Sequence, residues 1–532
     1  MLKIFSIVLL LLLSIKYLYA QSFPVNYKSV EELSLQKISE TLNDNPASNS
    51  ISDIIALGDT VWLGTSRGVS LSTDGGISWK NFYGSSAFGD QSISAIGYNN
   101  GTFWAATARS VEINGQNLPE GTGLKYTTDF GLTWNSIPQP LDQDTDTIEV
   151  YGDNTIRALP VTVAVQNLIY DIAFTKNTIW IATFAGGLRK STDNGQTWKR
   201  VVLPPDYLNS IKPTDTLDFC LQPVSGRFCA ENNLNHRVFS ISSANDSTLY
   251  VGTAGGINKS TDNGISWVKF NHTNQDQPIS GNFIVALGFN KSDNSLWAAT
   301  WKAEGESEFY GVSATWNGGE SWKTFLQGER AHNFGFKSLD IIIPADNGPF
   351  RSNDLGNSWI LPTSIFDTES GVELKTIIFY SAAATGADIW LGSVEGLVKL
   401  EQKSSDGIWE GTWKIFIASQ PLNSNNDTYA YPNPFSPKLD VLKIKYSTGG
   451  KRAKVTIRIF DFGMNYLRTV VQNVDRGNDI HQIDGFTADI NGVVDFWDGR
   501  DDAGNVVPNG VYFYRVEVDS NDPVYGKILV LQ

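Results

Sequence analysis

STDGGISW, at residues 72–79, is an octapeptide that returns along this chain as a repeated signature. The later copies are TTDFGLTW (127–134), STDNGQTW (191–198), STDNGISW (260–267), TWNGGESW (315–322) and SNDLGNSW (352–359), and a seventh, more divergent copy ends at Trp413. The intervals between copies are long enough for one small sheet each. Such spacing is typical of proteins that repeat one supersecondary unit many times.

Four positions of the octapeptide are shared by the copies, and each suits a tight turn. A hydroxyl residue comes first, an Asp or Asn two residues later can accept backbone hydrogen bonds, and a Gly two residues after that supplies a positive φ. The closing Trp can pack its large ring beneath the hairpin. We expect structural roles for Asp74, Trp79, Asp129, Trp134, Asp193, Trp198, Asp262, Trp267, Asn317, Trp322, Asp354 and Trp359.

The chain ahead of each octapeptide repeats as well. A period-2 apolar run and a short turn lead to an aromatic strand that ends in Gly or Ala followed by Thr or Ser, such as VWLGT (61–65) or IWIAT (179–183). Each unit therefore predicts four strands, and four antiparallel strands repeated radially form a β-propeller. We predict an all-β fold with a seven-bladed β-propeller of four-stranded antiparallel blades over residues 51–420. The short sixth unit is expected to take its inner strands from residues 334–344.

The octapeptides resemble the Asp-box, or BNR, repeat, and the resemblance covers residues 51–417. This repeat is found in sialidases, sortilin-type receptors, xyloglucanase-type hydrolases and photosystem assembly factors. The resemblance implies a propeller that serves either for binding or for glycoside hydrolysis.

The N-terminus has the three-part layout of a secretory signal. MLKIFSIVLLLLLSIKYLYA (1–20) has a lysine near its start, an apolar core of about a dozen residues and Leu-Tyr-Ala ahead of Gln21. The apolar run is shorter than the ~20 residues that a membrane-spanning helix needs, so we expect a signal peptide whose cleavage leaves Gln21 first. Residues 21–50 form a polar N-terminal segment that could pack on the propeller or add a strand to it.

The composition agrees with an exported all-β protein. Glycine is abundant at 48 residues, aromatic residues make up 12% of the chain and charged residues only 18%. The formal net charge is −15 and the sequence has no basic clusters, which argues against nucleic acid as a partner. Apart from the calcium discussed next, no cofactor is expected, and we expect a monomer.

A first insertion, residues 138–166, contains the acidic run DQDTDTIEVYGD. Asp142, Asp144 and Asp146 have the alternate spacing of the first three ligands of a calcium loop, which makes calcium a candidate cofactor. Thr147, however, stands where such a loop needs Gly, and no Glu closes the loop. The other interpretation is a solvated acidic loop.

A second insertion, residues 204–237, carries the only two cysteines, Cys220 and Cys229. In an exported chain two nearby thiols usually pair, so we expect a disulfide. A bridge around so short a loop would contribute about 2–3 kcal/mol on chain-entropy grounds. The alternative is a metal site, for which His236 is the only histidine nearby.

The pattern changes after PLNSNNDT (421–428), a polar linker. Alternating strands then predict a small β-sandwich over residues 429–532. YPNPF (431–435), WDGRD (497–501) and GVY (510–512) resemble the FlgD-type immunoglobulin-like domain, and their position resembles that of the C-terminal sorting domain of type IX secretion cargo. The resemblance implies the secretion machinery as a partner, although the last five residues lack the basic residue that such tails commonly carry.

Enzyme activity is the competing class, and its catalytic residues are unknown from the sequence. A sialidase needs an arginine cluster, but IRALP (156–160) echoes the family's Arg-Ile-Pro signature only with an inserted residue and in a different unit. A xyloglucanase-type hydrolase needs two facing carboxylates. A third insertion, residues 301–310, offers Glu304, Glu306 and Glu308, for which a solvated rim is the other interpretation.

We therefore predict an exported or cell-surface propeller that binds a glycan or an extracellular protein and is displayed through its C-terminal sandwich. The binding surface is expected on one rim, built from the three insertions with exposed aromatic side chains. The alternatives are a sialidase-like or xyloglucanase-like glycoside hydrolase, and a periplasmic location. Few contacts are expected to cross the linker, so that ring and sandwich would fold separately.

Overall fold

The computed structural model describes residues 42–531 apart from residues 44, 224–228, 231, 304, 370–371, 375, 419–427, 432, 439–440, 449–451, 478–486 and 490–491. The predicted signal peptide, most of the N-terminal segment and nearly all of the linker lie outside the described residues. Within them the chain is β-structure, with one short 3-10 helix at Leu234–His236. It forms two compact units, one containing Leu63–Val69 and Phe82–Leu339 and the other Thr41–Trp62, Ser70–Asn81 and Asp340–Gln532.

The first unit contains four sheets in succession along the chain, each built around one meandering run of antiparallel strands. They are β6 (Ser92–Asn99), β7 (Thr102–Ile113), β8 (Gln116–Thr127) and β9 (Asn135–Ile137); β12 (Ile169–Thr175), β13 (Thr178–Thr183), β14 (Gly187–Ser191) and β15 (Lys199–Arg200); β18 (Val238–Ser243), β19 (Leu249–Thr253), β20 (Gly256–Ser260) and β21 (Trp267–Phe270), with β16 (Ser210–Ile211) added at the outer edge; and β22 (Phe283–Asn290), β23 (Ser295–Trp301), β24 (Gly311–Thr315) and β25 (Lys323–Phe325). The first strands of neighbouring sheets, β6, β12, β18 and β22, pack on one another in that order. This radial succession is the one that the repeated sequence units predict.

Two of the remaining sheets of the repeat region contain a four-stranded meander, whereas the sheet of the short sixth unit has three strands, with a single bridge between Arg351 and Ile360 at its outer edge. The three sheets are β26 (Gly335–Lys337), β27 (Asp340–Ala345) and β28 (Gly348–Ser352); β31 (Phe379–Thr385), β32 (Asp388–Ser393), β33 (Leu397–Glu401) and β34 (Thr412–Phe416); and β2 (Ile51–Leu57), β3 (Thr60–Thr65), β4 (Gly68–Ser72) and β5 (Trp79–Asn81). Within the second unit, β27 packs on β31 and β31 on β2. A short strand β1 (Leu42–Asn43) pairs antiparallel with β5, so the N-terminal segment adds a strand to this sheet.

The apolar run TIIFY (376–380), which precedes the last aromatic strand, forms a strand only at its end, because β31 begins at Phe379. The backbone N–H of Thr376 donates to Oε2 of Glu395 at 3.0 Å.

The octapeptides form one turn that recurs in six copies. In the copy at residues 191–198, Ser191 Oγ donates to Asp193 Oδ1 and accepts the N–H of Gly195, while Asp193 Oδ1 accepts the N–H of Thr197. The hydrogen bonds from Thr197 and Ser191 lower the pKa of Asp193 to about 2. The same bonds are made by the turns that begin at Ser72, Thr127, Ser260, Thr315 and Ser352.

The glycine of several turns has a second role that the sequence does not reveal, because it packs on an aromatic ring of a neighbouring sheet. Gly264 has φ +77°, and a Cβ built there would lie 2.5 Å from the ring of Trp180. Gly76 stands in the same relation to Trp390, and Gly319 to Phe270. The turn therefore joins successive sheets as well as closing its own hairpin.

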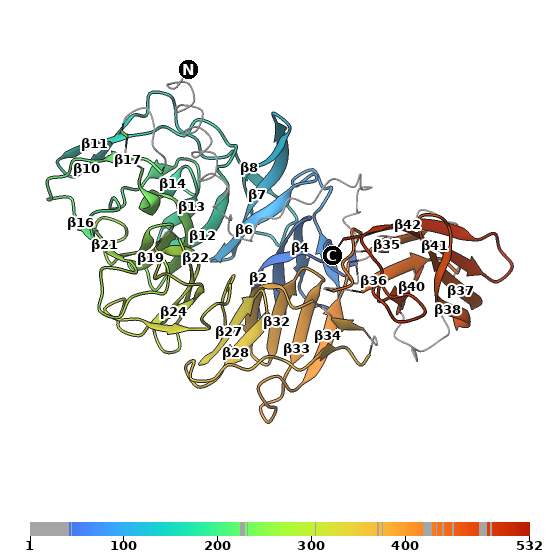
Figure 1. Cartoon of the computed structure of the whole chain (residues 1–532). Helices are drawn as coiled ribbons and strands as arrows, with labels where there is room; N and C mark the ends of the chain where they lie inside the picture. Colours follow the sequence, from blue (N-terminus) through green and yellow to red (C-terminus); the bar gives the residue numbers. More distant parts are fainter. Residues whose placement is uncertain are drawn as a thin grey trace, which may run out of the picture. The chain divides into compact units, whose positions relative to one another are not determined.

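The C-terminal region consists of two four-stranded sheets that share one core. Their strands are β35 (Thr428–Tyr431), β36 (Leu442–Tyr446), β40 (Gly492–Trp497) and β39 (Thr487–Asp489) in one, and β38 (Tyr466–Arg476), β37 (Ala453–Phe460), β41 (Gly510–Val518) and β42 (Val524–Val530) in the other. The core between them includes Tyr446, Trp497 and Tyr514. Two four-stranded sheets therefore enclose one core in the C-terminal region (Figure 1).

A buried ion pair links the repeat region to this sandwich within the second unit. Lys443 Nζ of β36 lies 2.5 Å from Oε1 of Glu395, which stands between β32 and β33, and both side chains are 2% exposed. Removing one partner of such a pair is costly, because the other charge stays buried. That ring and sandwich fold separately stays a prediction.

Candidate functional site

The first two insertions leave their sheets at the same end, as predicted. They do not, however, form a surface of exposed loops around that end. The strand register places Ile137, Ile169, Arg200 and Val238 on the side where each second strand finishes. Both insertions then turn back along the outer edges of the sheets. In the second, Ile211 of β16 pairs with Trp267, and in the first, Tyr151 Oη donates to the carbonyl of Ile265 in an octapeptide turn at the opposite end.

The folded-back insertions bury an apolar layer. Strands β10 (Ile148–Tyr151), β11 (Asn154–Ala158) and β17 (Cys220–Leu221) form a small sheet. Its side chains share a core with the sheets of β12–β15 and β18–β21, and this core includes Tyr151, Ile156, Trp180, Leu203, Phe219 and Trp267. The insertions pack against the sheets and do not form the exposed binding surface that was predicted. We attribute this difference to geometry, because radially arranged sheets diverge outward and leave a wedge-shaped space that apolar residues must fill. The sulfurs of Cys220 and Cys229 are bonded, with Cα atoms 6.3 Å apart.

His236 fixes the base of the second insertion as a neutral imidazole. The ring is 2% exposed; Nδ1 accepts the N–H of Gln222, and Nε2 lies 3.2 Å from the carbonyl of Leu203, to which it donates. Burial lowers the pKa of His236 to about 4.

Acidification is therefore expected to loosen this insertion. The unfolded chain takes up the proton near pH 6.5, whereas folded His236 resists it until about pH 4, so the stabilisation present above pH 6.5 is lost as the pH falls. At about pH 5 the loss is expected to be about 2 kcal/mol. This loss of stability is measured by hydrogen exchange of the Gln222 amide, compared at about pH 5 and above pH 6.5. The variant His236→Asn should show a flatter pH response, and an unchanged response would contradict the assignment.

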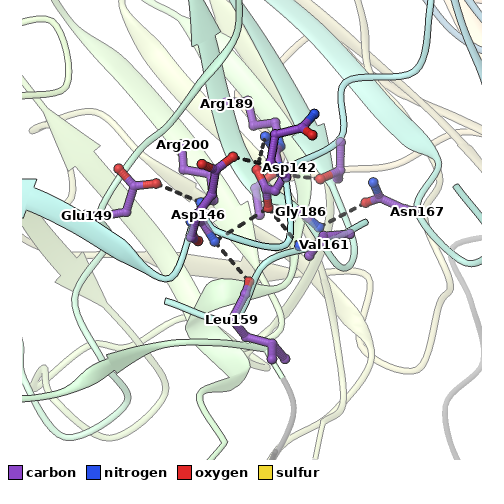
Figure 2. Close-up of polar contacts among 12 residues, drawn as sticks. Asp142, Asp146, Glu149, Leu159, Val161, Asn167, Gly186, Arg189 and Arg200 are labelled. Atoms are coloured by element: carbon purple, nitrogen blue, oxygen red, sulfur yellow. Dashed lines mark hydrogen bonds and ion pairs between the residues drawn. The ribbon is translucent and has the colours of Figure 1, made fainter. Parts of the chain in front are cut away.

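Asp142 lies at the centre of a buried ion cluster (Figure 2). Its Oδ1 pairs with Arg189 Nη1 at 2.8 Å and its Oδ2 with Arg200 Nη1 at 3.5 Å, and Oδ2 also accepts the N–H of Val161. Arg200 reaches further, to Glu149 at 2.7 Å. The cluster ties the first insertion to the sheet of β12–β15.

This geometry does not support the calcium interpretation of the acidic run. Asp142 is engaged by two guanidinium groups, Asp146 Oδ2 accepts the N–H of Gln143, and Asp144 is exposed. In the part of the chain that the structure describes, no group of three or more His, Cys, Asp or Glu side chains is placed to hold a metal ion. The three aspartates therefore do not converge.

The described glutamates of the third insertion, which were considered as hydrolytic carboxylates, do not all lie on an exposed surface. Glu308 is 7% exposed and binds backbone, accepting the N–H groups of Asn282 and Ala303 at 3.0 and 2.7 Å. Glu306 is exposed, and Glu304 lies outside the described residues. Arg157 of IRALP is exposed, whereas the buried guanidinium groups of the ion cluster belong to Arg189 and Arg200.

Aromatic side chains at this end contact one another instead of facing solvent. Phe239 packs edge-on against Phe283 with ring centroids 4.6 Å apart, and Phe283 contacts Trp301 in turn. Phe239 and Trp301 are fully buried. The expectation of exposed aromatics on the first two insertions holds for Tyr207, which is 60% exposed.

An exposed feature at this end was missed by the sequence analysis. Strands β7 and β8 continue as a hairpin, residues 108–121, beyond the end of β6 (Figure 1). Asn114 and Gly115 form its tip with positive φ, the signature of a tight two-residue hairpin turn. Its base is held by the first insertion, because Gly121 N–H donates to the carbonyl of Ala164 and Gln166 N–H to that of Pro119. The sequence signal that could have predicted this hairpin is Asn114-Gly115, which follows a run of alternating polar and apolar residues.

The octapeptide residues lie at the other end of the sheets and serve the fold. Trp79, Trp267 and Trp322 are buried, whereas Trp134, Trp198, Trp359 and Trp413 keep part of their surface exposed. Asp74, Asp129, Asp193, Asp262, Asn317 and Asp354 each accept hydrogen bonds within their own turn.

Comparison with known proteins defines the class of fold. No protein-family model matches the chain, and no curated protein does. An ancestral GH74 enzyme matches with a TM-score of 0.51 at 15% identity, over 92% of this chain and 63% of that one. This likeness, with the radial sheets, shows an all-β protein of the β-propeller class, as predicted.

Two further solved structures are similar at lower scores. PorZ, an essential surface component of the type-IX secretion system of Porphyromonas gingivalis, matches with a TM-score of 0.39 at 15% identity, over 90% of this chain and 65% of that one. YCF48 from Cyanidioschyzon merolae matches with a TM-score of 0.41 at 15% identity, over 68% of this chain and 97% of that one. The chain spans less than two thirds of the length of PorZ and of the GH74 enzyme. Among the described residues, no helix is long and apolar enough to cross a membrane.

Proposed function

We propose that this chain is an exported or cell-surface, seven-bladed β-propeller whose task is to bind a glycan or an extracellular protein. The observation that carries the proposal is the hairpin of residues 108–121, which exposes its tip and is braced at its base by the first insertion. Loops held on a rigid scaffold are the usual place of binding sites. Of the described glutamates considered for hydrolysis, in contrast, Glu308 is buried and binds backbone, and Glu306 is exposed.

The finer features of the proposal rest on the sequence patterns together with the sheets. Seven sheets carry the repeated units, which supports seven blades. The two-sheet C-terminal region supports an FlgD-type sandwich that addresses the secretion machinery, and the layout of residues 1–20 supports export, with the periplasm as the alternative location.

Shortening the hairpin tests the binding surface. Residues 110–119 are replaced by Asn-Gly, which keeps the cross-strand pair of Arg109 and Glu120 next to a favoured turn. Binding of residues 21–532 to glycan and protein arrays is measured first, and then the affinity for the ligand found. We expect the shortened chain to bind at least about tenfold more weakly, a loss of about 1.4 kcal/mol.

The matched control is Gln196→Ala, an exposed position in an octapeptide turn at the opposite end of the sheets. This variant should bind as the parent does. Equal affinity of parent and shortened chain, or hydrolysis of an array glycan, would overturn the proposal in favour of another surface or of the hydrolase alternative.

A further inference from the structure

One sheet of the C-terminal region turns an aromatic surface to solvent. In this sheet, made of β38, β37, β41 and β42 (Figure 1), alternate residues of β37 and β41 fill the core, and the residues between them point outward. The outward set includes Phe460 of β37 and Phe513 of β41, which the strand register places opposite each other. Tyr466 of β38 lies opposite Phe460 on the other side and is 49% exposed. Three adjacent strands therefore present one row of aromatic rings.

The loop between β37 and β38 and the edge strand β42 enlarge this surface. Phe462 in the loop is 75% exposed, and its ring centroid lies 6.3 Å from that of Phe513. Met464 of the same loop is 50% exposed, and Tyr525 of β42 is 52% exposed. Exposed apolar side chains that gather in one place, and do not stand singly, mark interaction sites. We call this surface the aromatic face and define it by Phe460, Phe462, Tyr466, Phe513 and Tyr525.

Basic side chains lie among these rings. Arg458 of β37 is opposite Arg515 of β41, and Lys527 of β42 is opposite Phe513. The two guanidinium groups contact the same carboxylate oxygen, Oε1 of Glu517, which Arg458 Nη1 approaches to 3.0 Å. Among the described residues Glu517 is the only carboxylate paired with either arginine, and the exposed Lys527 forms no ion pair. Three positive charges thus share one negative charge, although the formal net charge of the chain is −15, so this place is complementary to an anionic ligand.

Arg515 keeps hydrogen-bond donors for such a ligand. Its Nη2 contacts Glu517, but its Nε makes no hydrogen bond to any described residue. The guanidinium carbon lies 5.8 Å from the ring centroid of Phe460, so the cation and the aromatic ring adjoin. A guanidinium group binds a carboxylate through two parallel N–H bonds, and the face of an aromatic ring packs on a flat apolar surface. A ligand that uses both groups has a carboxylate beside a flat apolar face, which is the structure of a uronic acid ring.

Two other classes of partner fit these groups less well. An extended peptide pairs with the free edge of a sheet, whereas Arg458 and Arg515 lie on β37 and β41, the two inner strands. An anionic lipid surface would meet Asp461 in the exposed loop and also Asp502, whose carboxylate accepts the hydroxyl hydrogen of Tyr466. Such a surface would repel both carboxylates. A polysaccharide covers only the arginine side of the aromatic face and avoids them.

We propose that the aromatic face binds an acidic polysaccharide, with Phe462 and Phe513 stacked on its sugar rings and with Arg458 and Arg515 bound to its uronate carboxylates. The site is separate from the hairpin of residues 108–121, so it gives the chain a second means of attachment, whatever that hairpin binds. Salt is expected to weaken the binding, because part of it is the attraction between partly exposed charges.

Titration calorimetry of residues 21–532 with hexasaccharides of galacturonate, mannuronate and hyaluronan tests the proposal. We expect the parent to bind at least one of the three, and to bind it more weakly when sodium chloride is raised from about 50 to about 500 mM. Phe462→Ala removes an exposed ring and Arg515→Gln removes a cation, and each should weaken binding at least about tenfold. Neither side chain belongs to the core of the sandwich, so both variants should fold as the parent does.

Arg452→Gln and Tyr207→Ala are the matched controls, because both side chains are 60% exposed and lie outside the aromatic face. Both controls, and the chain with the shortened hairpin, should bind the hexasaccharide as the parent does. If only the chain with the shortened hairpin loses binding, the sugar is bound at the hairpin, which supports the proposed function and overturns this inference.

Three further results would contradict the acidic polysaccharide. They are no binding of any of the three hexasaccharides, unchanged binding by Phe462→Ala and Arg515→Gln, and equal binding of the galacturonate hexasaccharide and a neutral galactose hexasaccharide. Binding of the parent to phosphatidylglycerol vesicles, lost in the same two variants, would replace the polysaccharide with a lipid surface and overturn the proposal as well.

Discussion

Replacing Glu395 by alanine is expected to lower the free energy of unfolding by about 3–5 kcal/mol, because the change removes the carboxylate that balances the buried ammonium group of Lys443. Oε1 of Glu395 contacts Lys443 Nζ at 2.5 Å, and Oε2 accepts the N–H of Thr376 at 3.0 Å. Both carboxylate oxygens are therefore used, and water has little access to replace them. The midpoint of urea unfolding of the full chain measures the loss.

Lys414→Ala is the matched control. Lys414 belongs to an exposed pair in the same unit, 3.8 Å from Glu401, with side chains 39% and 37% exposed, and its removal should cost less than about 1 kcal/mol. Equal small losses for the two variants would show that Glu395 and Lys443 do not form a buried pair in solution.

The substitution Glu395→Gln is expected to have opposite effects on the stability of the full chain and of a chain without the sandwich. In the full chain the substitution should be destabilising, because Lys443 loses its counter-charge. In a chain that ends at residue 418, Glu395 has no partner at position 443, and removing its charge should be neutral or stabilising. A truncated chain that is as stable as the full one, with no reversal, would support the prediction that ring and sandwich fold separately.

The repeated turn could be predicted from sequence because its chemistry is local. Asp193 binds groups only two to four residues away, and Gly195 has the positive φ that its position in the turn requires. The aromatic strands were predictable for a similar reason, since alternation and β-branched residues determine which face is buried. VWLGT lies within β3 and IWIAT within β13.

The insertions and the ion pairs could not be predicted, because their partners are distant in sequence. Lys443 occupies a polar position of an alternating strand, which indicates solvent exposure until Glu395 is brought against it by the fold. Asp142 looked like part of an acidic loop, and only the position of β14 and β15 shows it between Arg189 and Arg200. Nothing local marks such contacts, because burial and charge pairing depend on tertiary packing.

The octapeptide tryptophans differ in burial, and this difference changes the expected cost of removing them. Trp267 is 1% exposed and belongs to the core that the insertions complete, with Ile211 paired beside it. Trp267→Ala should therefore lower the free energy of unfolding by about 3–5 kcal/mol through the cavity that it leaves. Trp198, which sequence alone would rank equally, is only partly buried and donates Nε1–H to the carbonyl of Gly195.

Trp198→Ala is consequently expected to cost less, about 1–2 kcal/mol, and serves as the matched comparison in the same turn of a neighbouring sheet. Denaturant midpoints of the two variants and the parent, with unchanged slopes, give the difference. The difference depends on the second insertion, because the burial of Trp267 requires β16 as well as its own sheet. Equal costs for Trp267 and Trp198 would mean that the insertion adds no protection, and the description of the insertions as packed against the sheets would be wrong.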